Sequence, residues 1–67
     1  MVEYRVTVTD IEDQKEILTE LSFPTIEAAY EMVYWHRDMV EHRNIEILLE
    51  RIGDNYACLY MQKSNRL

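Results

Sequence analysis

The sequence predicts an α+β fold in which a four-stranded, mostly antiparallel sheet has one helix packed on one face, in the order strand, strand, helix, strand, strand. Polar and apolar residues alternate in stretches on both sides of the chain centre, which is the period of a half-buried strand. One central stretch, residues 25–44, has the period of a helix instead. A single helix can cover only one face of a sheet, so these observations together define the architecture.

The first two strands are predicted at residues 2–9 and 16–23, where apolar and polar residues alternate. The polar, acidic residues 10–14 between them are predicted to form a hairpin connection. Residues 11–21 are also rich in Glu, Lys, Gln and Leu, so a helix is the alternative there. We favour the strand because this stretch runs directly into Pro24, and because a hairpin gives the first strand a partner.

The helix is predicted to begin at Thr25, a good N-cap that follows Pro24, and to end near Asn44. At about 100° per residue, one apolar stripe should face the sheet. This stripe consists of Ile26, Ala29, Val33, His36 and Val40. His36 is therefore predicted to be a core or boundary histidine with satisfied hydrogen bonds, not a metal ligand.

A second apolar row on the helix exceeds what a helix on a sheet requires. It consists of Ala28, Met32, Trp35 and Met39. A chain of 67 residues is predicted to be one domain, and a domain of this size buries only about 60% of its unfolded surface. Marginal stability and spare apolar surface together predict a homodimer. The candidate interface residues are Trp35, Met32, Met39, Tyr56, Tyr60 and Leu48.

The last two strands are predicted at residues 45–52 and 56–61, joined by a hairpin turn that contains Gly53, the only glycine of the chain. Residues 62–67 are mostly polar and are predicted to fray. All residues of the last strand are apolar or aromatic, so some of them must face away from the helix. An exposed apolar patch of this kind is typical of an interface, and scattered exposed side chains are the alternative.

The compartment is predicted from the single cysteine, Cys58, which cannot form a disulfide within the monomer. A lone thiol fits a reducing cytoplasm. The first residues lack the pattern of a signal peptide, and no apolar run approaches the length of a membrane span. We therefore expect a cytoplasmic protein without membrane contact. Because its neighbours are apolar, Cys58 is expected to be buried and unreactive.

The net charge of −6 is concentrated in the first half of the chain. Residues 1–31 contain eight carboxylates and two cations, whereas residues 32–67 contain five of each. An acidic chain disfavours direct binding to nucleic acid, because neutralising phosphates requires clustered Lys and Arg. It permits binding to a basic protein partner.

Residues for catalysis are nearly absent from the sequence. Neither Ser22 nor Ser64 has a His and an Asp at a recognisable spacing, and one glycine cannot build a phosphate-binding loop. We therefore predict a small acidic protein that is not an enzyme, uses no cofactor and binds another protein.

A group of carboxylates on the helix and in the first connection is the candidate partner-binding face. Its residues are Glu27, Glu31, Asp38, Glu41, Asp10, Glu12 and Asp13. An ordinary solvated helix face is the simpler interpretation. Carboxylates four residues apart lie about 6 Å apart along a helix axis, close to two phosphate steps of roughly 3.4 Å each along DNA. The face would therefore also suit an inhibitor that imitates a row of phosphates. Small inhibitors from phages and mobile elements work in this way, and the analogy extends only to this class of protein.

The rival interpretation is a small homodimeric enzyme or a metal-binding module. Asp38 and His42 are four residues apart on the helix, and Glu31 on the same face is a candidate third ligand. A structural metal site usually has four ligands, so this signal is weak. Tyr30, Tyr34 and Trp35 would suit a cofactor slot. Aromatic residues at helical spacing are more typical of a core or a subunit interface.

Overall fold

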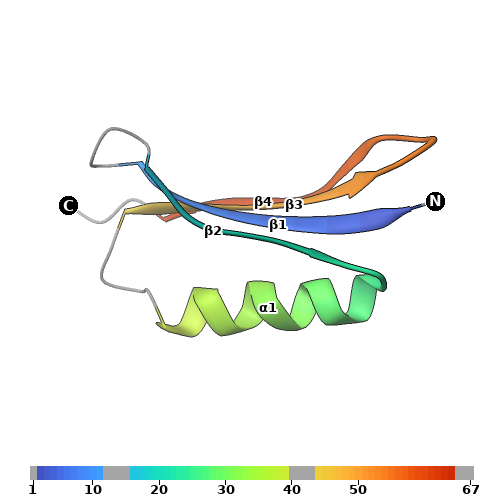
Figure 1. Cartoon of the computed structure of the whole chain (residues 1–67). Helices are drawn as coiled ribbons and strands as arrows, with labels where there is room; N and C mark the ends of the chain where they lie inside the picture. The colour runs from blue at the N-terminus through green and yellow to red at the C-terminus, as the bar shows by residue number, and fades with distance from the viewer. Residues whose placement is uncertain (1, 12–15, 40–43, 65–67) are drawn as a thin grey trace.

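The computed structural model describes residues 2–11, 16–39 and 44–64, and for Glu16, Asp38, Met39 and Ser64 it describes the backbone only. Two pairs of strands flank one helix along the chain (Figure 1). The elements in chain order are β1 (Glu3–Asp10), β2 (Glu16–Phe23), α1 (Ile26–Met39), β3 (Ile45–Ile52) and β4 (Ala57–Ser64). The predicted α+β class and the predicted order of elements are confirmed.

The four strands form one antiparallel sheet in the order β2-β1-β3-β4. The central strands are therefore β1 and β3, and the edge strands are β2 and β4. In the central pair, Val6 lies opposite Leu49 and Val8 lies opposite Ile47. Because α1 connects the edge strand β2 to β3 on the far side of β1, it lies along one face of the sheet (Figure 1).

The core lies between α1 and the two central strands. Its buried apolar residues are Val6, Val8, Ala29, Val33, Ile45, Ile47 and Leu49. Every second residue is buried over much of β1 and β3, as the predicted alternation requires. Of the predicted sheet-facing stripe of α1, Ala29, Val33 and His36 are buried as expected. Ile26 is partly buried, and Val40 lies outside the described residues. The helix therefore packs most closely on the middle of the sheet.

The start of α1 confirms the predicted N-cap. Thr25 Oγ1 accepts a hydrogen bond from the backbone N–H of Ala28 at 3.3 Å, and the Thr25 carbonyl accepts one from Ala29 at 3.3 Å. The first bond satisfies a donor that the first turn of a helix leaves free, and the second is the first regular backbone bond of the helix. Toward the other end, residues 40–43 lie outside the described residues. Asn44 is no longer helical, and its carbonyl accepts a hydrogen bond from Ile11 N–H at 3.1 Å.

The connection between β3 and β4 is the predicted turn. Gly53 has a φ angle of 156°, in a region that residues with a Cβ atom avoid. Arg51 Nε donates a hydrogen bond to the carbonyl of Asn55 at 3.0 Å, which ties the turn back to the end of β3. The only glycine of the chain thus lies where the backbone requires one.

A β-bulge determines which side chains of β4 face the helix. The register between β3 and β4 shifts by one residue near the middle of the strands. As a result, Leu59 and Tyr60 both pack against the core. Cys58 and Met61 lie on the opposite face of the sheet, and both are exposed. The apolar residues of β4 are therefore divided between the two faces by the bulge and not by simple alternation.

The strand β4 continues to Ser64, past the predicted end at Met61. Lys63 lies opposite Glu46, and its Nζ is 3.6 Å from Glu46 Oε2. The eight residues of β3 offer a full row of backbone partners, so polar residues can continue the neighbouring strand. Residues 62–64 of the predicted tail thus belong to β4, and the rest of that tail lies outside the described residues.

Asp10 is the last residue of β1 and is only 7% exposed, whereas the sequence predicts it in an exposed connection. It follows Val8 by two positions, so the pleat of the strand directs it to the helix side of the sheet. There it lies opposite Ile45 of β3. Asp10 therefore does not belong to an exposed acidic face, and Glu12 and Asp13 lie outside the described residues.

The predicted burial of Cys58 is also wrong, because the bulge places this thiol on the open face of the sheet, where it is exposed. We expect Cys58 in the native protein to react with an aromatic disulfide reagent within about tenfold of its rate in denaturant. The measurement is the absorbance of the released thiolate over time, with Cys58→Ser as the blank. A native rate lower by a factor of a hundred or more would place the thiol inside the protein and contradict the register of β4.

Candidate functional site

The helix leaves the edge strand β2 only partly covered. Leu21 of β2 lies opposite Val6 of β1, so both side chains are on the helix side of the sheet. Val6 is fully buried, whereas Leu21 is 45% exposed. The difference arises because α1 packs mainly over β1 and β3. Apolar surface of β2 therefore remains open to solvent beside the helix.

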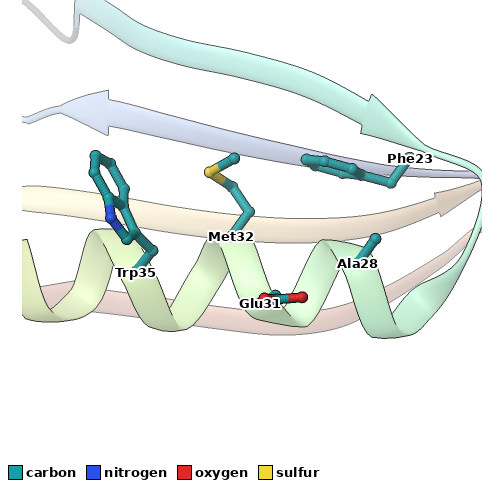
Figure 2. Close-up of a pocket in the computed structure, with 5 residues that line it drawn as sticks. All are labelled: Phe23, Ala28, Glu31, Met32 and Trp35. Carbon is teal, nitrogen blue, oxygen red and sulfur yellow. The ribbon is translucent and has the colours of Figure 1, made fainter.

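A groove of about 410 Å³ lies between α1 and β2 (Figure 2). It is lined by Phe23, Ala28, Glu31, Met32 and Trp35. Figure 2 shows the side chains of Met32 and Trp35 rising from the helix on the side where Phe23 of β2 lies. Met32 and Phe23 also pack against the core, whereas Trp35 is 57% exposed. The groove can therefore accept an apolar side chain between an aromatic wall and a flexible thioether.

Exposed carboxylates lie beside this groove on α1 and on the opposite face of β2. Glu31 lines the groove itself, and Glu27 lies one turn earlier on α1. Glu20 of β2 is exposed on the opposite side of the same strand, where it pairs with Thr7 of β1. Among the described residues, none of these three carboxylates forms a salt bridge. The lining contains no Lys or Arg, so the groove presents negative charge to a ligand.

The other flank of α1 is closed by a cluster of tyrosines. The rings of Tyr30 and Tyr34 stack with centroids 6.1 Å apart, and Tyr30 meets Tyr60 of β4 edge-on at 6.4 Å. The guanidinium carbon of Arg37 lies 5.1 Å from the centroid of Tyr34. The aromatic residues that the sequence groups together are thus separated, because Trp35 faces the groove on the β2 side. Tyr60, a candidate interface residue, packs within its own fold.

His36 is buried between these two flanks, at 7% exposure, as predicted for a core histidine. Its Nδ1 lies 3.0 Å from the carbonyl oxygen of Met32. A carbonyl oxygen can only accept, so Nδ1 donates this hydrogen bond. The ring of His36 also meets Trp35 edge-on, with centroids 4.8 Å apart. His36 therefore supports the indole that borders the groove.

The open face of the sheet is more polar than the sequence suggests. Leu48 and Met61 lie opposite each other there, and Leu48 is partly buried. The same face carries two ion pairs. Arg5 Nη2 lies 3.7 Å from Glu3 Oε2, and Lys63 Nζ lies 3.6 Å from Glu46 Oε2. Tyr56 is exposed, and its hydroxyl donates a hydrogen bond to Glu50. Charged and polar groups thus lie among the apolar side chains of this face, and the predicted homodimer stays a prediction.

Of the predicted acidic face, the structure shows two members, Glu27 and Glu31, exposed on one side of α1. Asp10 is buried elsewhere. The Asp38 side chain and residues Glu12, Asp13 and Glu41 lie outside what the structure describes. The phosphate-row hypothesis therefore stays a prediction with two supporting carboxylates.

The rival metal site stays a prediction as well. Its proposed ligands included Asp38 and His42, whose side chains lie outside the described residues. Within residues 2–11, 16–39 and 44–64, no group of three or more His, Cys, Asp or Glu side chains is placed to hold a metal ion. In the same part of the chain, no helix has the length and apolar character needed to cross a membrane.

The hydroxyl of Tyr56 provides a spectroscopic test of the open face. The hydrogen bond to Glu50 is the main cause that raises the pKa of Tyr56 above its ordinary value of 10.0. A phenolate cannot donate that bond, so the neutral form is favoured. Folding raises the pKa of Tyr56 above 10.0. The stability that this hydrogen bond contributes is therefore fully present below pH 10.0 and is lost as the pH rises through the pKa of Tyr56 in the folded protein.

We expect Glu50→Gln to lower the pKa of Tyr56, because the substitution removes the charge that accepts the bond. The measurement is a titration of ultraviolet absorbance, taken as the difference between each protein and its Tyr56→Phe counterpart. An identical midpoint in the two backgrounds would show that the hydrogen bond is not formed in solution.

Only part of the groove is predictable from the sequence. Met32 and Trp35 follow from the second apolar row of the helix. Phe23 belongs to the predicted second strand, and it lines a groove only because that strand is an edge of the sheet. The signal in the sequence was the apolar arc of the helix, which is wider than a sheet can cover.

Comparison of the chain with protein-family models, with curated proteins and with solved structures finds no match. The function is therefore inferred from the groove and its surroundings. The groove and its surroundings offer a ligand apolar contacts next to a negative charge.

Proposed function

We propose that this chain is a non-enzymatic module that binds another protein through the groove between α1 and β2. The observation that supports this proposal most strongly is Trp35, which is 57% exposed beside Met32 and Phe23. Tryptophan and methionine are enriched in the cores of interfaces, and tryptophan is frequent among the residues that contribute most to binding. A large indole exposed beside an apolar groove therefore favours a binding role.

The partner is expected to present an apolar side chain next to a basic one. The apolar side chain would fill the groove between Phe23 and Met32, and the basic one would approach Glu31. The net charge of −6 would speed the approach of a basic partner and disfavour an acidic one. We place the protein in the cytoplasm, because its only cysteine is an exposed thiol and such thiols persist in a reducing compartment.

The homodimer predicted from the sequence is the alternative use of the exposed apolar surface. On the open face it would rest on Leu48, Met61 and Tyr56, where charged pairs limit the apolar area. In the groove it would bring two copies of Glu31 near each other. We therefore assign the groove to a different protein, and sedimentation velocity at micromolar concentrations tests for self-association directly.

The test of the proposed function uses a random peptide library displayed on phage. The library is selected against the wild-type protein and, in parallel, against Trp35→Ala. We expect the wild type to enrich peptides that combine an apolar anchor with Lys or Arg. Trp35 is the only tryptophan, so its fluorescence should shift to shorter wavelength as each peptide binds. If both proteins enrich the same peptides, the groove is not the binding site.

A further inference from the structure

We infer that the outer edge of β2 pairs with an extended segment of the partner, whose residues alternate between apolar and basic. This inference rests on the proposed function and adds the conformation and the side-chain pattern of the bound segment. The segment would add a strand next to β2, with one row of its side chains in the groove. Addition of a strand to a sheet edge is a common way to recognise a peptide.

The backbone of β2 is suited to such pairing. It is an eight-residue edge strand, and within the described residues no element pairs with its outer side. An edge strand presents a row of N–H and C=O groups that a further strand can bind. Three apolar side chains of β2 are exposed as well, Ile17, Leu18 and Leu21. The other edge, β4, differs because Lys63 is exposed on it and the tyrosine cluster closes the adjacent flank of the helix.

The two faces of β2 specify the side chains of the added strand. On the helix side, Phe23 lines the groove and Leu21 is exposed two residues before it, so residues of the segment that point there should be apolar. On the opposite side, Glu20 is exposed, so a residue that points there should be Lys or Arg. Side chains alternate between the two faces from Thr19 to Phe23, beyond the register shift that lies between Ile17 and Thr19. The result is an alternating apolar and basic segment.

A second copy of this chain fits the same edge poorly. The sequence of β2 contains two glutamates, Glu16 and Glu20, and no cation. Antiparallel pairing of two β2 strands would give neither glutamate a cation, and the registers that place Glu20 opposite Glu20 or Glu16 would bring like charges together, which destabilises strand pairs. The charge pattern favours a basic partner over self-pairing.

The test uses an eight-residue synthetic peptide, equal in length to β2, in which Lys alternates with Leu or Val. Binding is measured by the fluorescence of Trp35. Each backbone nitrogen of the peptide is then methylated in turn, because N-methylation removes one N–H donor and leaves the side chains unchanged. In a strand only every second N–H faces β2. We expect alternate positions to lose about tenfold in affinity each and the positions between them to change little.

Two controls define the result. A peptide with Glu in place of Lys should bind the wild-type protein at least tenfold more weakly than the Lys peptide does. In the Glu20→Gln variant, the ratio between the affinities of the two peptides should be smaller. On the protein side, backbone N–H groups of β2 should exchange more slowly with solvent in the complex. Period-two sensitivity together with this protection supports strand addition.

Other outcomes overturn the inference in distinguishable ways. Binding that depends on Trp35 but shows no period-two pattern would exclude strand addition and leave the proposed groove function intact. Equal binding of the Lys and Glu peptides would exclude the basic pattern. No binding of the Lys peptide, while library peptides still bind through Trp35, would reject this segment as the ligand. Protection of β2 in the absence of peptide, with a dimer mass in sedimentation, would assign the edge to a second copy.

Discussion

Replacing Trp35 with alanine is expected to weaken the binding of library-selected peptides by about 30-fold or more, which corresponds to about 2 kcal/mol. The indole is the largest exposed element of the groove lining, and truncation removes one wall of the groove. The stability of the fold should change little, because most of the side chain is in solvent. Calorimetric titration gives the affinity. Because the variant lacks the only tryptophan, circular dichroism reports its folding.

The matched control is Tyr34→Ala. Tyr34 is the neighbouring aromatic residue on α1, with a comparable exposure of 49%, and it contacts Tyr30 on the opposite flank of the helix. Peptide affinity should therefore stay within about twofold of the wild type. If Tyr34→Ala weakens binding as much as Trp35→Ala does, the contact surface is the whole exposed side of the helix and not the groove.

Replacing Leu49 with alanine should destabilise the protein by about 2–5 kcal/mol. Leu49 is fully buried on the helix side of β3, opposite Val6 of β1 and Tyr60 of β4. Its truncation removes contacts with both neighbouring strands and leaves a cavity in a small core. A domain of this length has a total stability of roughly 3–10 kcal/mol, so the substitution should remove a large share of it. Thermal and urea denaturation, followed by circular dichroism, measure the loss.

The adjacent residue provides the control. Leu48 is chemically identical and next in sequence, but it is partly buried on the open face opposite Met61. We expect Leu48→Ala to cost less than about 1.5 kcal/mol, because fewer contacts are lost and solvent can fill the space. Equal losses for the two variants would mean that a partner or a second copy covers the open face. That result would favour the homodimer.

The local elements were largely predictable because each depends on neighbouring residues. Alternation located β1, β2 and β3 to within one or two residues of the observed bounds. Thr25 marked the start of the helix, and Gly53 marked the turn between the last two strands. The helical period identified Ala29, Val33 and His36 as the face on the sheet. These features arise from backbone geometry and from the separation of polar and apolar residues over a few positions.

The ends and the faces of some strands depended on their neighbours in space. Asp10 is buried because β1 pairs with β3 along its whole length, and β4 continues to Ser64 because β3 offers partners that far. Cys58 is exposed because the bulge shifts the register of β4. A bulge adds one residue to one strand of a pair, so the alternation of a single strand does not reveal it.

The candidate site was decided in the same way. The sequence by itself determined the fold class, the acidic charge and the second apolar row of the helix that contains Met32 and Trp35. Only the tertiary structure decided that β2 is an edge strand and that α1 packs mainly over β1 and β3. The helix is too narrow to cover all four strands, so Leu21 of β2 stays exposed beside it, and Phe23 of the same strand lines a groove with that row. Strand order is a long-range property set by the packing of the whole sheet, and no local pattern of residues encodes it.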